Sequence, residues 1–139
     1  MEIILKNKAE ERQKLLAALE QFALAHHLPP KALQAADLAL EEHLTNVLNH
    51  AYSDRLAHEI IVRLSADEQW LQIEVEDDGQ PFDPTARPEV DLSIPLEKRP
   101  IGGLGVHLMR RFMDELEYRR VADRNVLRMR KRLTMPNAE

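Results

Sequence analysis

A helical pattern of hydrophobic positions dominates the chain between residues 33 and 52. Apolar side chains recur there every three or four residues, the spacing of one face of an α-helix; they are Leu33, Leu40, Leu44, Val47, Leu48 and Ala51. Glu42, Asn46 and Asn49 follow a similar period, and we expect them on the opposite side. Such a polar row is typical of any surface helix, although glutamate can hold a proton and an asparagine carbonyl suits a hard cation such as Mg²⁺.

The rest of the chain alternates between strand-like and helix-like patterns. The predicted strands are Glu2–Lys6, Glu59–Ser65, Trp70–Asp77, Glu115–Val121 and Asn125–Leu133, and the other predicted helices are Glu10–His26 and Val106–Phe112. Pro29 and Pro30 separate the first helix from the second. This order predicts one α+β domain over residues 1–139, a two-layer α/β sandwich in which helices cover one face of a mainly antiparallel sheet.

Asp77 breaks the pattern of the strand that it ends. Hydrophobic and polar residues alternate strictly along Trp70–Asp77, and the alternation places Asp77 on the inward face with Leu71, Ile73 and Val75. A carboxylate at the core-facing end of a strand is costly unless it is hydrogen bonded. We therefore expect Asp77 to have a specific partner.

The stretch from Phe82 to Gly102 has no periodic pattern and contains four prolines. A loop of this length in a small domain is usually functional, and its prolines favour a semi-stiff lid over residues 82–102. The run Gly103-Leu104-Gly105 then opens the third predicted helix. A helix N-terminus offers free backbone N–H groups to an anion.

Composition narrows the classes of partner. The net charge of −5 does not favour nucleic acid, whose phosphates normally require a basic surface. Seven basic residues between Arg119 and Arg132 leave a nucleic-acid surface as an alternative, but we expect a solvated sheet face whose arginines pair with Glu74 and Glu76. The chain has no cysteine, which excludes disulfides, zinc–thiolate sites and cysteine nucleophiles. No apolar run approaches the roughly 18 residues of a membrane span, so we expect a cytoplasmic protein.

These signals describe one ligand when they are combined. The inward carboxylate could accept a hydrogen bond from an exocyclic amine such as that of adenine. The polar row on the helix could hold Mg²⁺ beside a terminal phosphate, and the glycine-rich helix start could bind the phosphates. Together they predict a pocket for a purine nucleoside triphosphate.

The same stretches resemble the N, G1 and G2 boxes of the GHKL (Bergerat-fold) ATPases. The matching motifs are Glu42-His43-Leu44-Thr45-Asn46…His50-Ala51-Tyr52, Asp77-Asp78-Gly79-Gln80-Pro81-Phe82, Gly103-Leu104-Gly105…Met113-Asp114-Glu115 and the closing run from Asn125 to Lys131. More narrowly, the chain is similar to the stand-alone anti-sigma-factor serine-protein kinases of bacterial partner-switching systems. The resemblance runs from the first helix to the last strand and rests on the order and spacing of the boxes.

The resemblance implies ATP and Mg²⁺ as cofactors and a role for each matching position. Asn46 would bind Mg²⁺, Glu42 would act on the attacking hydroxyl, and Asp77 would accept a hydrogen bond from the adenine amine. Asn49 is a further candidate for the metal shell. Gly79 would keep the base close to the loop.

Further positions would complete the nucleotide site. Pro81 and Phe82 follow in the same loop as Gly79, and Pro81 stands where many members of the family have a second glycine. Backbone N–H groups of Gly103, Leu104 and Gly105 would reach the phosphates. No basic residue directly precedes this glycine run, so Lys98 and Arg99 are the candidates for contacting the γ-phosphate.

The resemblance also implies partners. The expected activity is phosphorylation of a STAS-type anti-anti-sigma protein, with a sigma factor as a second partner and a homodimer formed through the first strand and helix. The alternative is a binding module that sequesters its partner without phosphorylating it, although Glu42 and Asn46 are both present. The ATPase half of a histidine kinase is disfavoured, because no helical module with a phosphoacceptor histidine precedes the domain.

Overall fold

The computed structural model describes residues 1–86 and 103–133. Its elements in chain order are β1 (Glu2–Lys6), η1 (Ala9–Glu11), α1 (Arg12–Ala25), α2 (Pro30–His50), β2 (Glu59–Ala66), β3 (Trp70–Asp77), η2 (Pro84–Ala86), α3 (Gly103–Phe112), β4 (Glu115–Val121) and β5 (Arg124–Arg132). This order is the one that the hydrophobic pattern predicts. The main difference is that α3 begins at Gly103, three residues before the predicted start at Val106.

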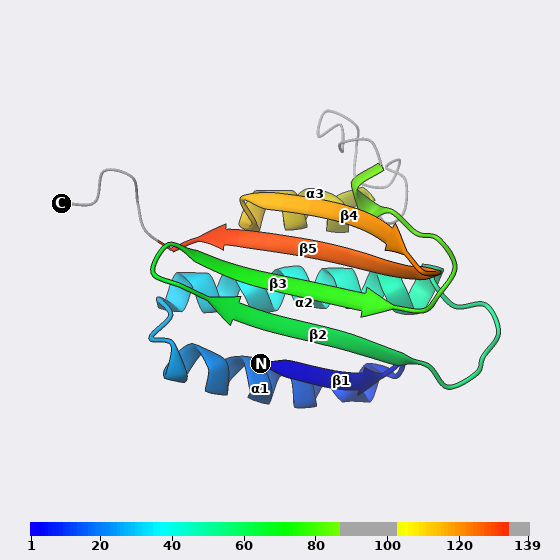
Figure 1. Cartoon of the computed structure of the whole chain (residues 1–139), viewed down its shortest axis with the longest axis horizontal. Coiled ribbons are helices and arrows are strands. Elements are labelled where there is room, and N and C mark those ends of the chain that lie inside the picture. The colour runs from blue at the N-terminus through cyan, green and yellow to red at the C-terminus, as the bar shows by residue number, and fades with distance from the viewer. Residues whose placement is uncertain (87–102, 134–139) are drawn as a thin grey trace.

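The five strands form one antiparallel sheet in the order β1-β2-β3-β5-β4. Figure 1 shows the three α-helices on one face of this sheet, with α2 running behind the central strands. The predicted α+β sandwich with an antiparallel sheet is therefore confirmed. Because β5 inserts between β3 and β4, the end of β3 lies beside the start of β5, and Asp77 pairs with Asn125.

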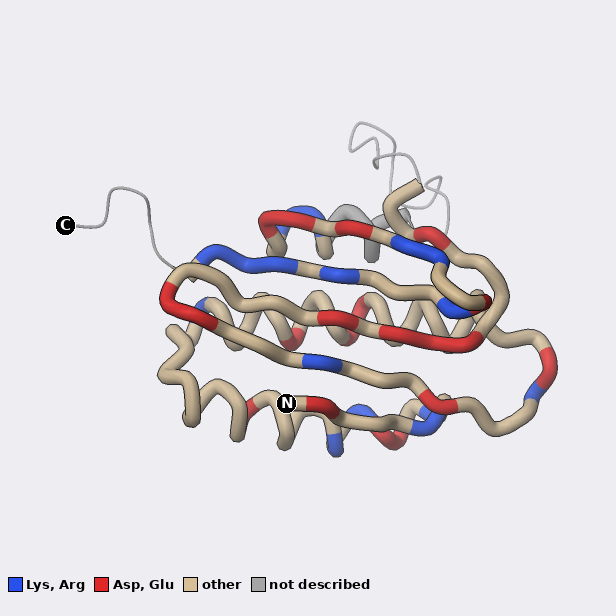
Figure 2. The backbone as a smooth tube through the Cα atoms, viewed as in Figure 1, with Lys and Arg blue, Asp and Glu red and all other residues tan. Residues whose placement is uncertain are grey.

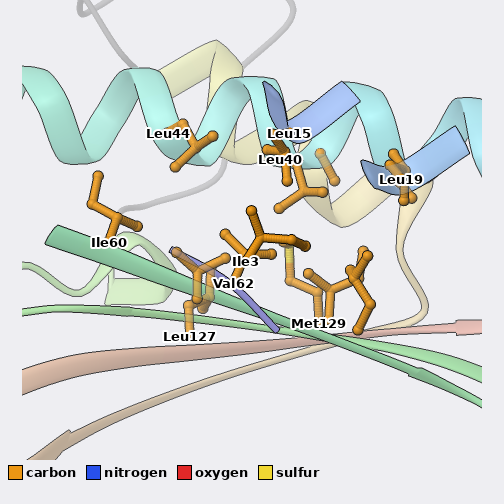
Figure 3. Close-up of a cluster of buried hydrophobic side chains, with 14 of the residues drawn as sticks. Ile3, Leu15, Leu19, Leu40, Leu44, Ile60, Val62, Leu127 and Met129 are labelled. Atoms are coloured by element: carbon orange, nitrogen blue, oxygen red, sulfur yellow. The ribbon is translucent and has the colours of Figure 1, made fainter. Parts of the chain in front are cut away.

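The core fills the space between the helices and the inner face of the sheet. Figure 3 shows side chains from α1 and α2 packed against side chains from β1, β2 and β5. Those that it labels are Ile3, Leu15, Leu19, Leu40, Leu44, Ile60, Val62, Leu127 and Met129, all of them buried. Burial of these side chains is the main term that holds α2 against the sheet.

The other face of the sheet carries charge of both signs. Figure 2 shows basic positions along β5 and acidic positions along β3 and β4. Arg124 of β5 pairs with Glu76 as predicted, whereas Glu74 pairs with Arg63 of β2, at 3.5 Å. The remaining arginines of β5 pair mostly with the neighbouring strand β4, as Arg128 does with Glu117 at 2.7 Å. These exposed pairs neutralise one another, which fits a solvated sheet face.

In the described part of the chain, no helix is both long enough and apolar enough to span a bilayer.

Candidate functional site

Helix α2 carries the polar row that the sequence singles out. Its side chains differ in exposure, since Asn46 is buried with 6% exposed, Glu42 is half-buried and Asn49 is exposed. The expectation that the row lies opposite the buried face is therefore wrong for Asn46. The reason is that α2 packs against α3 as well as against the sheet, so the buried part of its surface is wider than one stripe.

The side-chain amide of Asn46 makes no hydrogen bond to any described residue. Its Nδ2 is buried without a partner among the residues that the structure describes. Because no hydrogen bond to a described residue fixes its orientation, the positions of Oδ1 and Nδ2 can be exchanged in the assignment. An unpaired buried amide costs free energy, and a ligand that bonds it recovers that cost.

Glu42 lies one helical turn before Asn46 and is also available. Among the described side chains, no ion-pair partner contacts its carboxylate. The adjacent Glu41 differs, because it forms an ion pair with Arg12 of α1. Of these two neighbouring glutamates, only Glu42 is thus left to act on a ligand or substrate.

Asp77 has the specific partners that the strand pattern requires. Its side chain is 2% exposed, and its Oδ1 accepts hydrogen bonds from Asn125 Nδ2 at 2.8 Å and from the Gly79 N–H at 2.9 Å. No hydrogen bond joins the other oxygen, Oδ2, to a described residue. Burial raises the pKa of Asp77, and the bonds from Asn125 and Gly79 oppose that rise.

Gly79 is needed for packing at the C-terminal end of α2. A Cβ at this position would lie 2.5 Å from the Ala51 carbonyl oxygen, so no larger residue fits without a shift of backbone. The next residue, Gln80, donates its N–H to the same carbonyl oxygen at 2.8 Å. The loop that carries Asp77 and Gly79 is therefore held tightly against the end of α2.

Two aromatic stacks strengthen this contact. The rings of His50 and Phe82 stack with centroids 5.1 Å apart, and those of Tyr52 and His58 stack at 4.3 Å. His50, which the sequence left without a role, thus packs against the loop that follows Asp77. Pro81 is exposed in this loop.

His58 bridges two carboxylates beside Asp77. Its Nε2 lies 2.8 Å from Asp54 Oδ1, and its Nδ1 lies 3.0 Å from Asp78 Oδ1. The hydrogen bond with Asp54 and then that with Asp78 raise the pKa of His58, although partial burial opposes them. The loop between α2 and β2 is in this way tied to the residue that follows Asp77.

Asn125 is the site residue that sequence reasoning missed. It belongs to the closing motif, but no role was assigned to it. The signal that could have found it is its register, because an inward asparagine at the start of the last strand lies opposite the buried Asp77. It is 4% exposed and also donates to the Gln80 carbonyl oxygen, at 2.9 Å.

The first residues of the predicted lid are held by the body of the domain. The Phe82 N–H donates to Asn125 Oδ1 at 3.2 Å, and Arg110 of α3 donates to the Thr85 carbonyl oxygen at 2.6 Å. The rest of the lid, with Lys98 and Arg99, lies outside the described residues.

The glycine run forms the first turn of α3. Gly103, Leu104 and Gly105 are its first three residues. Backbone N–H groups in the first turn of an α-helix have no partner within the helix, so this end is suited to an anion. Helix α3 packs beside α2, which carries Glu42 and Asn46.

His43 lies in the middle of the buried surface of α2. It is 3% exposed, and its Nδ1 has no hydrogen-bond partner among the described residues. Burial lowers the pKa of His43 to about 4, which keeps the ring neutral at pH 7. It is therefore a core residue beside Glu42 and carries no charge into the site.

The described residues form no ready-made metal cage. No group of three or more His, Asp or Glu side chains among them is arranged so that it could hold a metal ion. The donors suit a Mg²⁺ ion held by one protein carbonyl and by phosphate oxygens, because Mg²⁺ is usually bound by few protein groups. The unbonded Asn46 amide fits that requirement.

A separate pocket of about 200 Å³ lies between β1, η1 and α2. Its lining includes Leu5, Lys8, Leu44 and Ile60. It contains none of the predicted site residues, so it is not the site described above.

Comparison with known proteins identifies relatives of this chain. It is 29% identical over 102 residues to the serine/threonine-protein kinase BtrW of Bordetella bronchiseptica, covering 73% of this chain and 72% of BtrW. It is 35% identical over 85 residues to the serine-protein kinase RsbW of Bacillus velezensis, covering 58% of this chain and 52% of RsbW. The aligned region thus spans about half the length of RsbW.

Solved structures agree on the fold. A crystal structure of the RsbU and RsbW domains of a Mycobacterium tuberculosis protein matches 98% of this chain and 33% of that chain, with a TM-score of 0.66 at 15% identity. The histidine kinase domain of a blue-light activated kinase from Erythrobacter litoralis matches 76% of this chain and 46% of that chain, with a TM-score of 0.53 at 24% identity.

The family model for the histidine kinase-like ATPase domain matches residues 5–131. This range includes α2, the Asp77 loop, α3 and Asn125, which carry the candidate site. The chain belongs to the histidine kinase-like ATPase domain family.

Proposed function

We propose that this chain is an ATP-dependent serine-protein kinase and anti-sigma regulatory factor. The observation that carries the proposal is a pair of buried polar side chains that the described residues leave partly unbonded. Asp77 accepts no hydrogen bond from a described residue at Oδ2, and Asn46 has no described partner at Nδ2. Both belong to the motifs that define the family site, and the relatives BtrW and RsbW are named as serine or serine/threonine kinases.

Asp77 recognises the adenine base. Its Oδ1 is already bonded twice, so Oδ2 is the oxygen that accepts from an exocyclic amine. The loop from Gly79 through Pro81 and Phe82 lines the base, and its position is fixed by the contact of Gly79 with Ala51.

Asn46 and the start of α3 hold the triphosphate end. Asn46 supplies a carbonyl oxygen to Mg²⁺, and the exposed Asn49 adds to the shell of the ion. Backbone N–H groups of Gly103, Leu104 and Gly105 bind phosphate oxygens, and Lys98 or Arg99 contacts the γ-phosphate. Bound Mg²⁺ neutralises charge on the phosphates.

Glu42 is the general base. The serine Oγ of the partner bonds to the γ-phosphorus as the bond to the bridging oxygen of ADP breaks, and the Oγ proton passes to Glu42. Such transfer depends mainly on positioning and on charge neutralisation. The half-buried Glu42 has no competing cation among the described residues, which keeps it free to accept the proton.

The phosphoacceptor is a STAS-type anti-anti-sigma protein, and a sigma factor is the second partner. Support comes from the kinase names of the relatives and from the fold shared with the RsbW domain. One domain spans residues 1–139 and acts in the cytoplasm as a homodimer through β1 and α1, without a membrane or nucleic-acid partner.

Incubation with γ-labelled ATP, Mg²⁺ and candidate STAS proteins tests this function. The proposal predicts that label appears on a serine of one STAS protein. A chain that binds ATP and sequesters a sigma factor but labels no STAS protein would be a non-catalytic binding module. A chain that binds no ATP would refute both functions.

A further inference from the structure

Asn125 uses every hydrogen-bonding position of its side-chain amide. Nδ2 donates to Asp77 Oδ1 at 2.8 Å and to the Gln80 carbonyl oxygen at 2.9 Å. Oδ1 accepts from the Tyr118 hydroxyl at 2.6 Å, from Arg120 at 3.1 Å and from the Phe82 N–H at 3.2 Å. One buried side chain thereby joins β3, β4, β5 and the loop after β3.

The neighbours of the Asn125 amide determine which way it faces. The guanidinium of Arg120 and the N–H of Phe82 can only donate, so the atom that they contact must be the carbonyl oxygen. The NH₂ group must then face Asp77. Tyr118 adds a third donor to the same oxygen and makes a flipped amide still less favourable.

This orientation settles which Asp77 oxygen is left for a ligand. Asn125 and Gly79 both donate to Oδ1, and no described residue donates to Oδ2. A donor on Oδ1 favours the ionised carboxylate over the neutral acid. A carboxylate with one oxygen open accepts hydrogen bonds and has none to give.

Other charged groups around Asp77 do not replace Asn125. Burial and the charge of Asp78 raise the pKa of Asp77, whereas Arg120 of β4 lowers it. Tyr52, between α2 and β2, is itself kept neutral because burial and then the charges of Asp77 and Asp78 raise its pKa. Asn125 and the Gly79 N–H are therefore the direct donors to Asp77, and their hydrogen bonds favour its ionised form.

We propose that Asn125 is a specificity-determining residue, which makes Asp77 a pure acceptor and so selects 6-amino purines over 6-oxo purines. The 6-amino group of adenine donates a hydrogen bond, whereas the 6-oxo group of guanine only accepts one. An ionised Asp77 accepts a hydrogen bond from the 6-amino group and repels the 6-oxo group. A protonated Asp77 could donate a hydrogen bond to the 6-oxo group. The inference rests on the proposed nucleotide site. It assigns the choice of purine to Asn125 of β5, which bonds Asp77 and acts on the purine only through Asp77.

Asn125→Asp tests the proposal because it keeps size and an acceptor oxygen for Tyr118, Arg120 and Phe82. It replaces the donor with a second carboxylate beside Asp77, and such a pair shares a proton. Carbon-13 NMR of the Asp77 carboxyl should show its pKa rising by about 1 unit or more in the full chain. Calorimetry with ATP and GTP from pH 6 to 8 should show ATP selectivity falling about tenfold or more at pH 6.

Arg128→Gln is the matched control. It makes the same change in net charge on the same strand, but Arg128 pairs with the exposed Glu117 away from Asp77. Its nucleotide selectivity and Asp77 pKa should match those of the wild type.

The outcomes separate this inference from the proposed function. If the wild type binds ATP and Asn125→Asp keeps both the selectivity and the Asp77 pKa, the role of Asn125 is refuted and the ATP site stands. If the wild type binds neither nucleotide, the proposed function fails and the selectivity fails with it. Should Asn125→Asp not fold, the wild type alone decides: an Asp77 that is protonated at pH 7 overturns the inference, and one that is ionised from pH 6 to 8 with pH-independent ATP selectivity upholds it.

Discussion

The two ends of the candidate site are built differently. The carboxylate network of Asp77, Gly79 and Asn125 is joined by hydrogen bonds within the protein. In the α2 row of Glu42, Asn46 and Asn49, no described residue is hydrogen bonded to Nδ2 of the buried Asn46. No described cation pairs with Glu42. The first region is positioned by hydrogen bonds among described residues, whereas the second has polar groups that no described residue bonds and that a ligand can bond. The carboxylate network should therefore contribute to the stability of the fold, and the α2 row should contribute to activity.

Replacement of the general base Glu42 should give the largest effect on activity. That effect should arise from the α2 row alone. Glu42→Gln keeps the shape of the side chain but cannot accept the serine proton, so we expect phosphoryl transfer to fall about 10²–10⁴-fold. ATP affinity and partner affinity should stay near those of the wild type. Single-turnover transfer of labelled phosphate measures the change.

Glu41→Gln is the control for that experiment, because Glu41 is the adjacent acid and pairs with Arg12 instead. It should transfer phosphate at close to the wild-type rate. Equal rates for Glu42→Gln and the wild type would remove Glu42 from catalysis.

A methyl group at Gly79 should break the carboxylate network by displacing the loop from α2. The added Cβ would lie 2.5 Å from the Ala51 carbonyl oxygen, which belongs to rigid backbone. We expect Gly79→Ala to reduce the free energy of unfolding by about 3 kcal/mol. Urea denaturation measures this, and Gln80→Ala, at an exposed neighbour, should cost far less because its backbone hydrogen bond to Ala51 remains.

Two asparagine truncations compare the regions directly. Asn125→Ala leaves several buried groups without partners, so its unfolding free energy should fall by about 2–3 kcal/mol. Asn46→Ala removes an unpaired buried amide, so the desolvation cost that it relieves offsets the packing that it loses, and stability without ligand should fall far less than in Asn125→Ala while Mg²⁺–ATP binding weakens. Similar losses of stability in both variants would erase the distinction between the two regions.

Acid should weaken the fold through the buried surface of α2. Burial holds the pKa of His43 near 4, below the ordinary value of 6.5, so the unfolded chain binds this proton first. The contribution to stability is complete above pH 6.5 and is lost as the pH falls toward 4. Between pH 7 and pH 5 the loss should be about 2 kcal/mol. Urea denaturation of His43→Leu should show a pH dependence smaller by that amount, and an unchanged dependence would show that His43 is not the group that titrates.

The elements of this fold could be read from the sequence because their patterns are regular. The strand Trp70–Asp77 matches its predicted bounds, since strict alternation marks a sheet with one buried face. The bounds of Glu115–Val121 match as well, although its alternation ends at Arg119. The requirement that Asp77 have a partner also followed from that alternation.

The missed features depend on contacts between distant segments. Asn46 is buried because α3 packs on α2, and the pattern of α2 alone cannot show a second helix. Asn125 meets Asp77 because β5 inserts next to β3, a strand order that local spacing does not determine. The close contact of Gly79 with Ala51 at the end of α2 likewise joins segments that are distant in the sequence.

Calorimetric titration of the wild type and of Asp77→Asn with ATP–Mg²⁺ tests the central claim most directly. The amide is a weaker acceptor than the carboxylate and can present an N–H to the adenine amine. We expect the wild type to bind and the variant to lose about 1.5–3 kcal/mol of binding free energy, with its fold intact by circular dichroism. Equal ATP affinity in the two proteins would contradict the adenine-binding role of Asp77 and the account of the site built on it.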